Sequence, residues 1–181
     1  MDSISDLFPP IESARLCLRC IRPIDALATS AMMTPEVSQW VGYWPVPFTV
    51  EMAKFRIERA RAAAAAGKTL PFAAERLDRV LVGWIVFNRT DEDARRATFG
   101  YWFGKAHHGR GYMREVAPLA LAAGFRLLDV DVIEASAHPN NVASLAVLRR
   151  CGFRHIGQGM VAAPARDRDE LCDLFELARP D

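Results

Sequence analysis

The sequence predicts one α/β (α+β) domain organised around a single sheet. Strand-like and helix-like segments follow each other in the coarse order β, α, α, β, β, β, α, β, α, β, β, which amounts to about seven strands and about four helices. Three consecutive β-rich runs, separated by polar turns, predict an antiparallel meander in the middle of the chain. The 181 residues fit one domain, and no segment is rich enough in Gly, Ser or Pro to form a linker.

The N-terminal third of the chain predicts one strand followed by helices. The strand is expected in ARLCLRCI at 14–21, and a short helix is expected soon after it. Thr34 followed by Pro35 is typical of a cap and a first helical residue. For the next helix, Thr49 is the expected N-cap and Gly67 the expected C-cap, because apolar residues between them recur at helical spacing.

The rest of the chain predicts mostly strands, with two further helices. The expected elements are strands at 69–76, 81–89 and 97–103, a helix at about 112–128, a strand at 132–137, a helix capped by Asn141 and ending at Gly152, and strands at 153–161 and 170–178.

The composition excludes several classes of partner. A formal net charge of +1 argues against a nucleic-acid partner or a strongly acidic one. The N-terminus carries Asp2 and Asp6 and no basic residue before Arg15, so it lacks the pattern of a secretory signal. No apolar run reaches the length of about 18 residues that marks a membrane span. We therefore expect a cytoplasmic protein with no membrane partner.

The cysteines do not predict a metal site. Cys17 and Cys20 have the spacing of half a zinc motif, but on a strand their side chains would point to opposite faces. Cys151 and Cys172 are too far apart in the sequence to form a second pair. In a cytosolic protein all four are expected to be reduced thiols.

The segment GYWFGKAHHGRGYM at 100–113 contains the end of a predicted strand, then a glycine-containing loop, then the start of a predicted helix. Gly109 and Gly111 permit close approach of the backbone, and the helix start supplies unpaired N–H groups and the positive end of a dipole. Such a loop can hold a phosphate group, although a plain strand-to-helix turn explains the two glycines equally well. A dinucleotide-binding fingerprint would need a third glycine where Arg114 stands, and a Walker A loop is absent from the sequence.

Three segments resemble the GNAT acetyltransferases. HGRGYM at 108–113 resembles their pyrophosphate-binding segment, usually written Gln/Arg-x-x-Gly-x-Gly/Ala. ESARLCLRCIRPIDA resembles the opening of the ribosomal-protein N-acetyltransferase branch, and HPNNVASLAVLRRCGFRHIG resembles its closing coenzyme segment. The resemblance implies a mixed, mainly antiparallel central sheet of about seven strands flanked by about four helices. It places a single domain at 12–178, preceded by an N-terminal extension at 1–11.

Carried over position by position, the resemblance implies an acetyl-CoA site without a metal. Backbone groups of the glycine loop would bind the pyrophosphate, and the strand before the loop would pair with the pantetheine arm where it diverges from its neighbour. The implied coenzyme-binding residues are Trp102, Phe103, His108, Gly109, Arg110, Gly111, Tyr112, Met113, Asn141 and Arg150. The implied catalytic residues are Ser144, which would protonate the departing thiolate, and Tyr101, whose backbone would help to polarise the thioester carbonyl.

Three residues depart from the pattern of that family. His108 replaces Gln or Arg, and Met113 replaces a small residue. Pro118 lies inside the predicted helix, where it removes a hydrogen bond and clashes with the carbonyl of Arg114. We therefore expect a kink there, or a helix that restarts near Ala117.

Several further residues have a functional and an ordinary explanation. Asn141 is also a good helix cap. Arginines that could pair with phosphates or simply face solvent are Arg110, Arg114, Arg149 and Arg150. Residues that could accept a proton from an amine, or merely occupy a polar strand edge, are Glu134 and His138. Aromatic residues that could wall an acceptor pocket, or cover the core, are Trp40, Tyr43 and Trp44.

The predicted activity is acetyl transfer from acetyl-CoA to a primary amine, by direct attack in a ternary complex. The acceptor would be a protein N-terminal α-amine or a small-molecule amine. An α-amine titrates near 8 and a lysine amine near 10.4, so the lack of an obvious base favours an α-amine or another weakly basic acceptor, with water as the proton relay. The alternatives are a non-catalytic protein that binds or senses acetyl-CoA, and a nicotinamide enzyme. A homodimer is left open.

Overall fold

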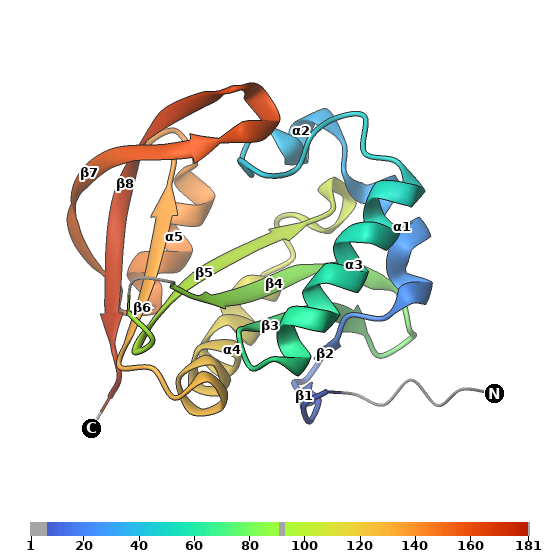
Figure 1. Cartoon of the computed structure of the whole chain (residues 1–181), viewed down its shortest axis with the longest axis horizontal. Coiled ribbons are helices and arrows are strands. Elements are labelled where there is room, and N and C mark those ends of the chain that lie inside the picture. The colour runs from blue at the N-terminus through green and yellow to red at the C-terminus, as the bar shows by residue number, and fades with distance from the viewer. Residues whose placement is uncertain (1–6, 91–92, 181) are drawn as a thin grey trace.

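The computed structural model describes residues 7–90 and 93–180. Within these residues the chain forms one eight-stranded sheet, in the order β1-β2-β3-β4-β5-β6-β8-β7, and five α-helices (Figure 1). The strands are β1 (Ile11–Glu12), β2 (Leu16–Cys20), β3 (Thr69–Arg76), β4 (Leu81–Arg89), β5 (Arg96–Phe103), β6 (Val132–Ala137), β7 (Arg154–Ala163) and β8 (Arg168–Ala178). The helices are α1 (Ala26–Met32), α2 (Pro35–Ser38), α3 (Val50–Ala65), α4 (Tyr112–Leu128) and α5 (Val142–Arg150).

The predicted fold class is confirmed, and most element boundaries lie within two residues of their predicted positions. The helix start predicted at Thr34 and Pro35 is confirmed: α2 begins at Pro35 and has four residues. The structure adds β1, whose two residues are too few to leave a periodic pattern in the sequence. Residues 1–6 of the predicted N-terminal extension lie outside the described part of the chain.

Two predicted caps start their helices as expected. The Thr49 hydroxyl accepts a hydrogen bond from the Met52 amide at 3.2 Å, and α3 begins at the next residue. The Asn141 side chain accepts one from the Ser144 amide at 3.2 Å, and α5 begins at Val142. Each cap satisfies one of the amides that the first turn of a helix leaves unpaired.

Helix α4 runs unbroken from Tyr112 to Leu128 through Pro118. The predicted restart near Ala117 was therefore wrong, and the kink, which was the other predicted outcome, stays a prediction. Arg114 and Pro118 are both exposed residues of this helix, so water can solvate the carbonyl that proline leaves without a helical donor.

The feature of the sheet that positions the site is the divergence of β5 from β6. These two strands are parallel and pair at three positions, from Arg96 opposite Val132 to Thr98 opposite Glu134. Beyond Thr98, β5 continues to Phe103 while still paired with β4 on its other edge. The edge of β5 that faces β6 therefore carries unpaired backbone groups, and a wedge-shaped gap opens between the two strands (Figure 1).

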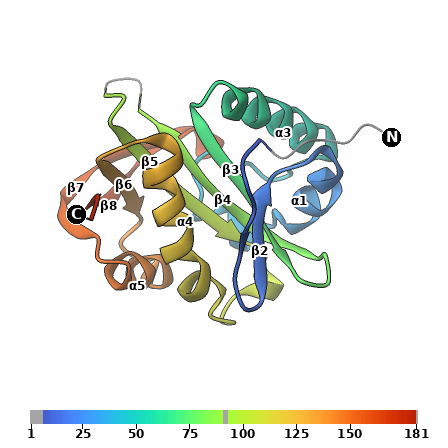
Figure 2. The ribbon, with the colours of Figure 1, turned by 90° about the horizontal axis from the view of Figure 1, so that it is seen from below.

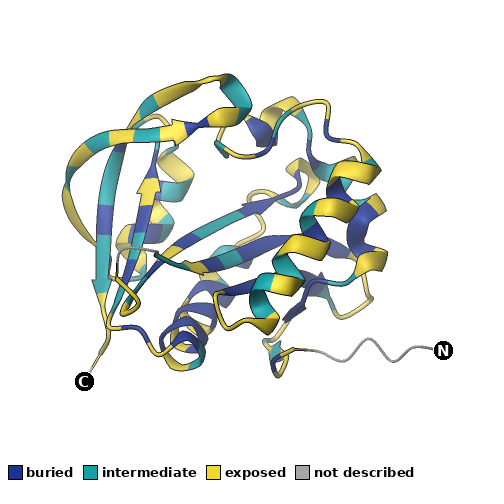
Figure 3. Ribbon diagram, in the orientation of Figure 1, coloured by how far each residue is buried: buried dark blue, intermediate teal, exposed yellow. Residues whose placement is uncertain are grey.

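Helices cover both faces of the sheet. Figure 2 shows α1 and α3 on one side and α4 and α5 on the other. Each side has its own core: the larger one packs α4 against the sheet around Phe72, Phe87 and Phe99, and the smaller one packs α1 and α3 around Trp84 and Trp102. The helices present buried residues to the sheet and exposed residues to solvent (Figure 3). Two aromatic cores on opposite faces hold the central strands β4 and β5 in place between them.

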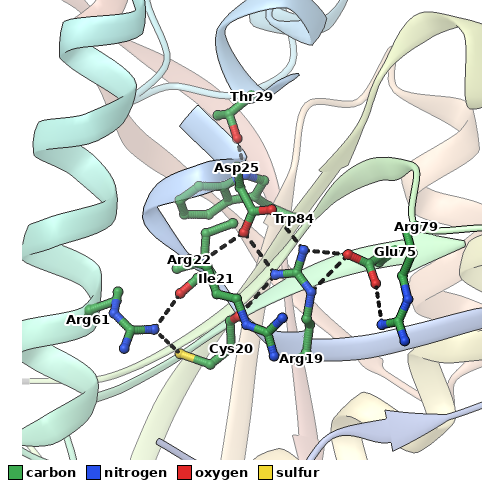
Figure 4. Close-up of polar contacts among 10 residues, drawn as sticks. All are labelled: Arg19, Cys20, Ile21, Arg22, Asp25, Thr29, Arg61, Glu75, Arg79 and Trp84. Atoms are coloured by element: carbon green, nitrogen blue, oxygen red, sulfur yellow. Dashed lines mark hydrogen bonds and ion pairs between the residues drawn. The ribbon is translucent and has the colours of Figure 1, made fainter. Parts of the chain in front are cut away.

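A buried ion cluster ties β2 and β3 to the turn before α1. The Arg19 guanidinium lies between the carboxylates of Asp25 and Glu75, donating to both Asp25 oxygens at 2.8 Å and to Glu75 at 2.5 Å (Figure 4). All three side chains are about 95% buried. Burial opposes ionisation of Glu75, but hydrogen bonds from Arg19 and Arg79 outweigh it, so the pKa of Glu75 lies below its ordinary value.

The described residues also allow three checks: for membrane-spanning helices, for disulfide bonds and for groups of metal ligands. None of their helices is both long enough and apolar enough to cross a bilayer. All four cysteines lie in the described part of the chain, and none of them forms a disulfide bond there. In the described part of the chain no three His, Cys, Asp or Glu side chains gather in a way that could hold a metal ion.

Candidate functional site

A cavity of about 830 Å³ opens where β5 and β6 diverge. One end is lined by the loop between β5 and α4. The other end is lined by the segment after α2, residues 39–44, and by the tip of the β7–β8 hairpin. Of the predicted site residues, those that line it are Tyr101, Trp102, Phe103, His108, Gly109, Arg110, Gly111, Tyr112, Met113, Asn141 and Ser144. Arg150 does not line the cavity and is exposed on the last turn of α5. The structure thus brings together all the predicted residues except that arginine.

The glycine loop adopts a conformation that few other residues could take. Gly109 has φ of 70° and Gly111 has φ of 72°, which lie in the left-handed region that disfavours residues with a Cβ. The first helical hydrogen bond of α4 runs from the Glu115 amide to the Gly111 carbonyl. The amides of Tyr112, Met113 and Arg114 therefore have no intrahelical partner, and they lie at the positive end of the α4 dipole. This is the arrangement that binds phosphate groups at helix N-termini.

His108 holds the start of this loop against β5. Its Nε2 atom lies 2.8 Å from the carbonyl oxygen of Phe103, the last residue of the strand. The side chain therefore binds the protein backbone, and the His108 amide is also engaged within the loop, donating to the Lys105 carbonyl at 3.2 Å.

Arg15, just before β2, is a residue of the site that sequence reasoning missed. Its Nη1 atom donates to the Arg110 carbonyl at 2.9 Å, and its guanidinium lies 4.9 Å from the centre of the Tyr112 ring. Its Nε atom donates to Glu115 at 2.6 Å. A β-carbon placed on Gly111 would lie 3.8 Å from the Arg15 Nη2 atom. Arg15, near the N-terminus, thus holds the glycine loop in place through its contacts with Arg110, Tyr112 and Glu115.

A pair of hydroxyl groups links β5 to α5. The Tyr101 hydroxyl on β5 and the Ser144 hydroxyl on α5 are 2.9 Å apart. Burial raises the pKa of Tyr101 to about 12, although the hydrogen bond to Ser144 lowers it in part. Tyr101 is therefore protonated at neutral pH and can donate to Ser144, which leaves the serine proton free for a different acceptor.

The two candidate bases have different surroundings. Glu134 lies at the closed end of the gap and forms an ion pair with Arg96 at 2.5 Å, and it does not line the cavity. His138 lines the cavity, and its Nδ1 atom accepts a hydrogen bond from the Asn140 amide at 3.1 Å. The structure therefore favours His138 over Glu134 as a residue that can face a bound amine.

His107 is a further titratable residue in the wall of the cavity. Burial lowers its pKa, and the neighbouring charge of Arg110 lowers it further. Its Nδ1 atom is buried without a hydrogen-bond partner among the residues that the structure describes. His107 is therefore neutral at pH 7.

The far end of the cavity is closed by a contact between two loops. The Ala165 amide donates to the Gly42 carbonyl at 2.9 Å, and Arg166 donates to the Ser38 carbonyl at 2.9 Å. The segment after α2 and the hairpin tip lie side by side at the top of Figure 1. A β-carbon on Gly42 would lie 2.8 Å from the Ala162 carbonyl oxygen, so only glycine permits this approach.

The three aromatic residues of the segment after α2 line the cavity beside this contact. Trp44 is buried against Trp84 and Trp102, with ring centroids at 5.2 Å and 5.0 Å. Trp40 and Tyr43 are exposed, and the Trp40 ring lies 6.1 Å from that of His138. Trp44 thus belongs to the core as well as to the cavity wall, whereas Trp40 and Tyr43 stand at its surface.

Known proteins with similar sequences are acetyltransferases by name. The family model described as acetyltransferase (GNAT) domain matches residues 15–154. The uncharacterized N-acetyltransferase YoaA of Bacillus subtilis is 31% identical over 153 residues, covering 83% of this chain and 86% of that protein. The uncharacterized N-acetyltransferase p20 of Bacillus licheniformis is 28% identical over 165 residues, covering 89% and 90%.

Solved structures with the same architecture include enzymes that modify ribosomal proteins. Mycobacterium smegmatis RimJ, in complex with CoA-disulfide, superposes with a TM-score of 0.82 at 25% identity, covering 97% of this chain and 90% of that one. The ribosomal-protein-S5-alanine acetyltransferase from Vibrio fischeri superposes with a TM-score of 0.82 at 19% identity, covering 96% and 98%. The second likeness concerns the fold alone.

Proposed function

The chain belongs to the GNAT acetyltransferase family, and from that premise we propose that it transfers an acetyl group from acetyl-CoA to a primary amine in a ternary complex. One observation carries the proposal: the open edge of β5 leads directly to a glycine loop at the N-terminus of α4. An acyl thioester with a long, phosphate-bearing arm matches a cavity with a phosphate site at one end and unpaired strand backbone beside it. The proposal places the acetyltransferase domain at residues 12–178.

The glycine loop would hold the diphosphate of the donor. The amides at the start of α4 can donate to phosphate oxygens, and the helix dipole favours their negative charge. Arg110 and Arg114 line the same end of the cavity and can add forked hydrogen bonds. Holding a flexible donor at several points lowers the entropic cost of bringing its thioester to the amine.

The divergent part of β5 would hold the arm that carries the thioester. Backbone N–H and C=O groups from Phe99 to Phe103 have no partner strand on the side of β6, so they can pair with amide groups of the donor. An N–H group near Tyr101 would also polarise the thioester carbonyl as negative charge develops on its oxygen.

Ser144 would complete the transfer. A neutral amine attacks the carbonyl carbon, the new C–N bond forms, and the C–S bond breaks. The Ser144 hydroxyl donates its proton to the departing sulfur, while Tyr101 donates a hydrogen bond to the serine oxygen and holds it in place. The proton of the attacking amine leaves to water, and the serine oxygen regains a proton from water, so the products are the acetylated amine and the free thiol of coenzyme A.

The experiment is a measurement of free thiol released from acetyl-CoA by the purified protein, with and without added amines, together with mass analysis of the amines. We expect thiol release that depends on the amine and an equal amount of acetylated product. Binding of acetyl-CoA without amine-dependent release would support the alternative, a protein that binds or senses the donor. Thermal stabilisation by a nicotinamide dinucleotide and none by coenzyme A would contradict both.

A further inference from the structure

The charged residues that line the cavity are mainly cationic. Its described lining residues include three arginines, Arg110, Arg114 and Arg166, but only one carboxylate, Glu170. Arg110 and Arg114 lie at the glycine-loop end, which the proposed function gives to the donor phosphates. The end that remains for the acceptor therefore contains one ion pair, Arg166 with Glu170.

Both carboxylate oxygens of Glu170 already accept hydrogen bonds from arginines. Its Oε1 atom accepts from Arg166 at 2.9 Å and from Arg168 at 2.9 Å and 2.7 Å, and its Oε2 atom accepts from Arg166 at 2.7 Å. The hydrogen bonds from Arg166 are the largest cause that lowers the pKa of Glu170 to about 2. An ammonium ion entering this end would have to compete with two guanidinium groups for the same two oxygens.

Arg166 is not free for an anion either. Besides Glu170, it donates to the carbonyl of Ser38 at 2.9 Å. The acceptor end thus offers neither an uncompensated carboxylate nor an uncompensated arginine among the described lining residues.

The rest of this end is mainly apolar and aromatic, with Gln39 and His138 as polar side chains. Its wall contains Val37, Trp40, Val41, Trp44 and Trp84. Aromatic faces can bind ammonium ions, but Trp44 already has the Arg56 guanidinium 4.3 Å from its ring centre. A surface of this kind stabilises apolar groups by removing them from water.

We propose that the acceptor is an α-amine attached to an apolar, preferably aromatic, group on a molecule with no second ammonium. This inference rests on the proposed function and names its substrate class. An α-amine can enter in its neutral form, whereas each further ammonium would lose water without gaining a carboxylate. Polyamines and other polycations are therefore poor acceptors, and N-terminal residues with large apolar side chains are good ones.

The test uses three acceptors that share one α-amino amide group: phenylalanine amide, alanine amide and lysine amide. With acetyl-CoA saturating, we expect kcat/KM to fall in that order, by about tenfold or more between the first and the last. Spermidine, which carries several ammonium groups, should be no better than lysine amide. A preference for lysine amide or spermidine would overturn the inference and leave the proposed acetyl transfer intact.

Variants of aromatic residues in the cavity wall test whether these residues cause the preference for phenylalanine amide over alanine amide. Trp40→Ala should reduce the ratio between phenylalanine amide and alanine amide about fivefold or more, with an unchanged dissociation constant for acetyl-CoA. Trp40 is 38% exposed, so its loss should not unfold the domain, and circular dichroism checks this. Phe55→Ala is the matched control, because Phe55 is exposed on α3 and does not line the cavity. An unchanged ratio in Trp40→Ala and in Tyr43→Ala would overturn the aromatic preference.

A binding measurement separates this inference from the proposed function. If no amine is acetylated, the proposed function fails, and the three amides are then titrated into the protein saturated with coenzyme A. Tightest binding of phenylalanine amide would still support the inferred ligand class. Tightest binding of lysine amide would overturn it.

Discussion

The Nη1 atom of Arg15 donates a hydrogen bond to the backbone carbonyl of Arg110 at 2.9 Å, across a sequence separation of 95 residues. The same guanidinium binds Glu115 in the first turn of α4. Glu115 in turn accepts from the Ser13 hydroxyl at 2.7 Å. The segment before β2 therefore fixes both the last turn of the glycine loop and the first turn of the helix.

Replacing Arg15 should loosen the donor site. We expect Arg15→Met to raise the dissociation constant of acetyl-CoA about tenfold, because the loop loses a charge-assisted brace, while kcat falls by much less. Calorimetry and initial rates measure the two quantities. Arg126→Gln is a matched control, since Arg126 lies exposed on the last turn of the same helix. Equal dissociation constants for the wild type and Arg15→Met would remove Arg15 from the site.

The hydroxyl pair predicts a change in turnover rather than in donor affinity. Ser144→Ala should lower kcat about 100-fold, the usual contribution of a general acid. Tyr101→Phe keeps the ring and removes only the hydrogen bond to Ser144, so a decrease of about fivefold is expected. Single-turnover rates at saturating donor give both values. An unchanged rate in Ser144→Ala would show that the sulfur receives its proton from elsewhere.

Gly42 should control the acceptor side alone. In Gly42→Val the new β-carbon would lie within 2.8 Å of the Ala162 carbonyl oxygen, so the hairpin tip and the segment after α2 must separate. We expect an acceptor KM about tenfold higher with no change in acetyl-CoA affinity. Gly67→Asn is the control, because Gly67 has φ of 70°, which asparagine tolerates, and lies at the end of α3. A loss of donor affinity in Gly42→Val would mean that the two ends of the cavity are not independent.

Among the polar contacts of the fold, we expect mutation of the buried ion cluster of Arg19, Asp25 and Glu75 to lower the free energy of unfolding the most. Arg19→Met leaves Asp25 and Glu75 buried without their shared cation, which should lower the free energy of unfolding by about 3–5 kcal/mol. Arg79→Gln removes an exposed partner of the same Glu75 and should cost no more than about 1 kcal/mol. Urea denaturation of the three proteins measures both differences, and similar losses in the two variants would contradict the assignment.

The same cluster predicts a dependence of stability on pH. The folded-state pKa of Glu75 lies below its ordinary value, so its carboxylate stabilises the fold at pH above the unfolded value of about 4.3. This contribution is lost as the pH falls through the folded-state pKa. The difference in unfolding free energy between the wild type and Glu75→Gln should therefore shrink between pH 7 and pH 3. A constant difference would show that Glu75 does not titrate with folding.

Local chemistry explains why much of the fold was predictable. Thr49, Asn141 and the two loop glycines act within a few residues of their own position, so the sequence around them is enough to locate three helices. The restart predicted near Ala117 was wrong because the local cost of Pro118 is outweighed by tertiary packing: Val116, Ala120 and Phe125 hold α4 against the sheet.

The site was predictable only where it is continuous in the sequence. The residues from Tyr101 to Met113 lie in one strand-loop-helix segment, and Ser144 lies in another. Arg15 and Gly42 reach the site through tertiary contacts, and no periodicity or motif marks such contacts in a single sequence. Glu170 and its partners Arg166 and Arg168 are close together in the sequence, but the sequence alone does not show that Arg166 and Glu170 line the cavity.

The most direct test of the account is calorimetric titration of acetyl-CoA into the folded protein and into Gly111→Val. The account predicts a measurable heat of binding for the wild type and none for the variant, because valine cannot adopt the φ of 72° that aims the loop amides. Circular dichroism should show that the variant is folded. Absence of binding to the folded wild type, or equal binding to both proteins, would contradict the claim that the glycine loop and the divergent strands form the donor site.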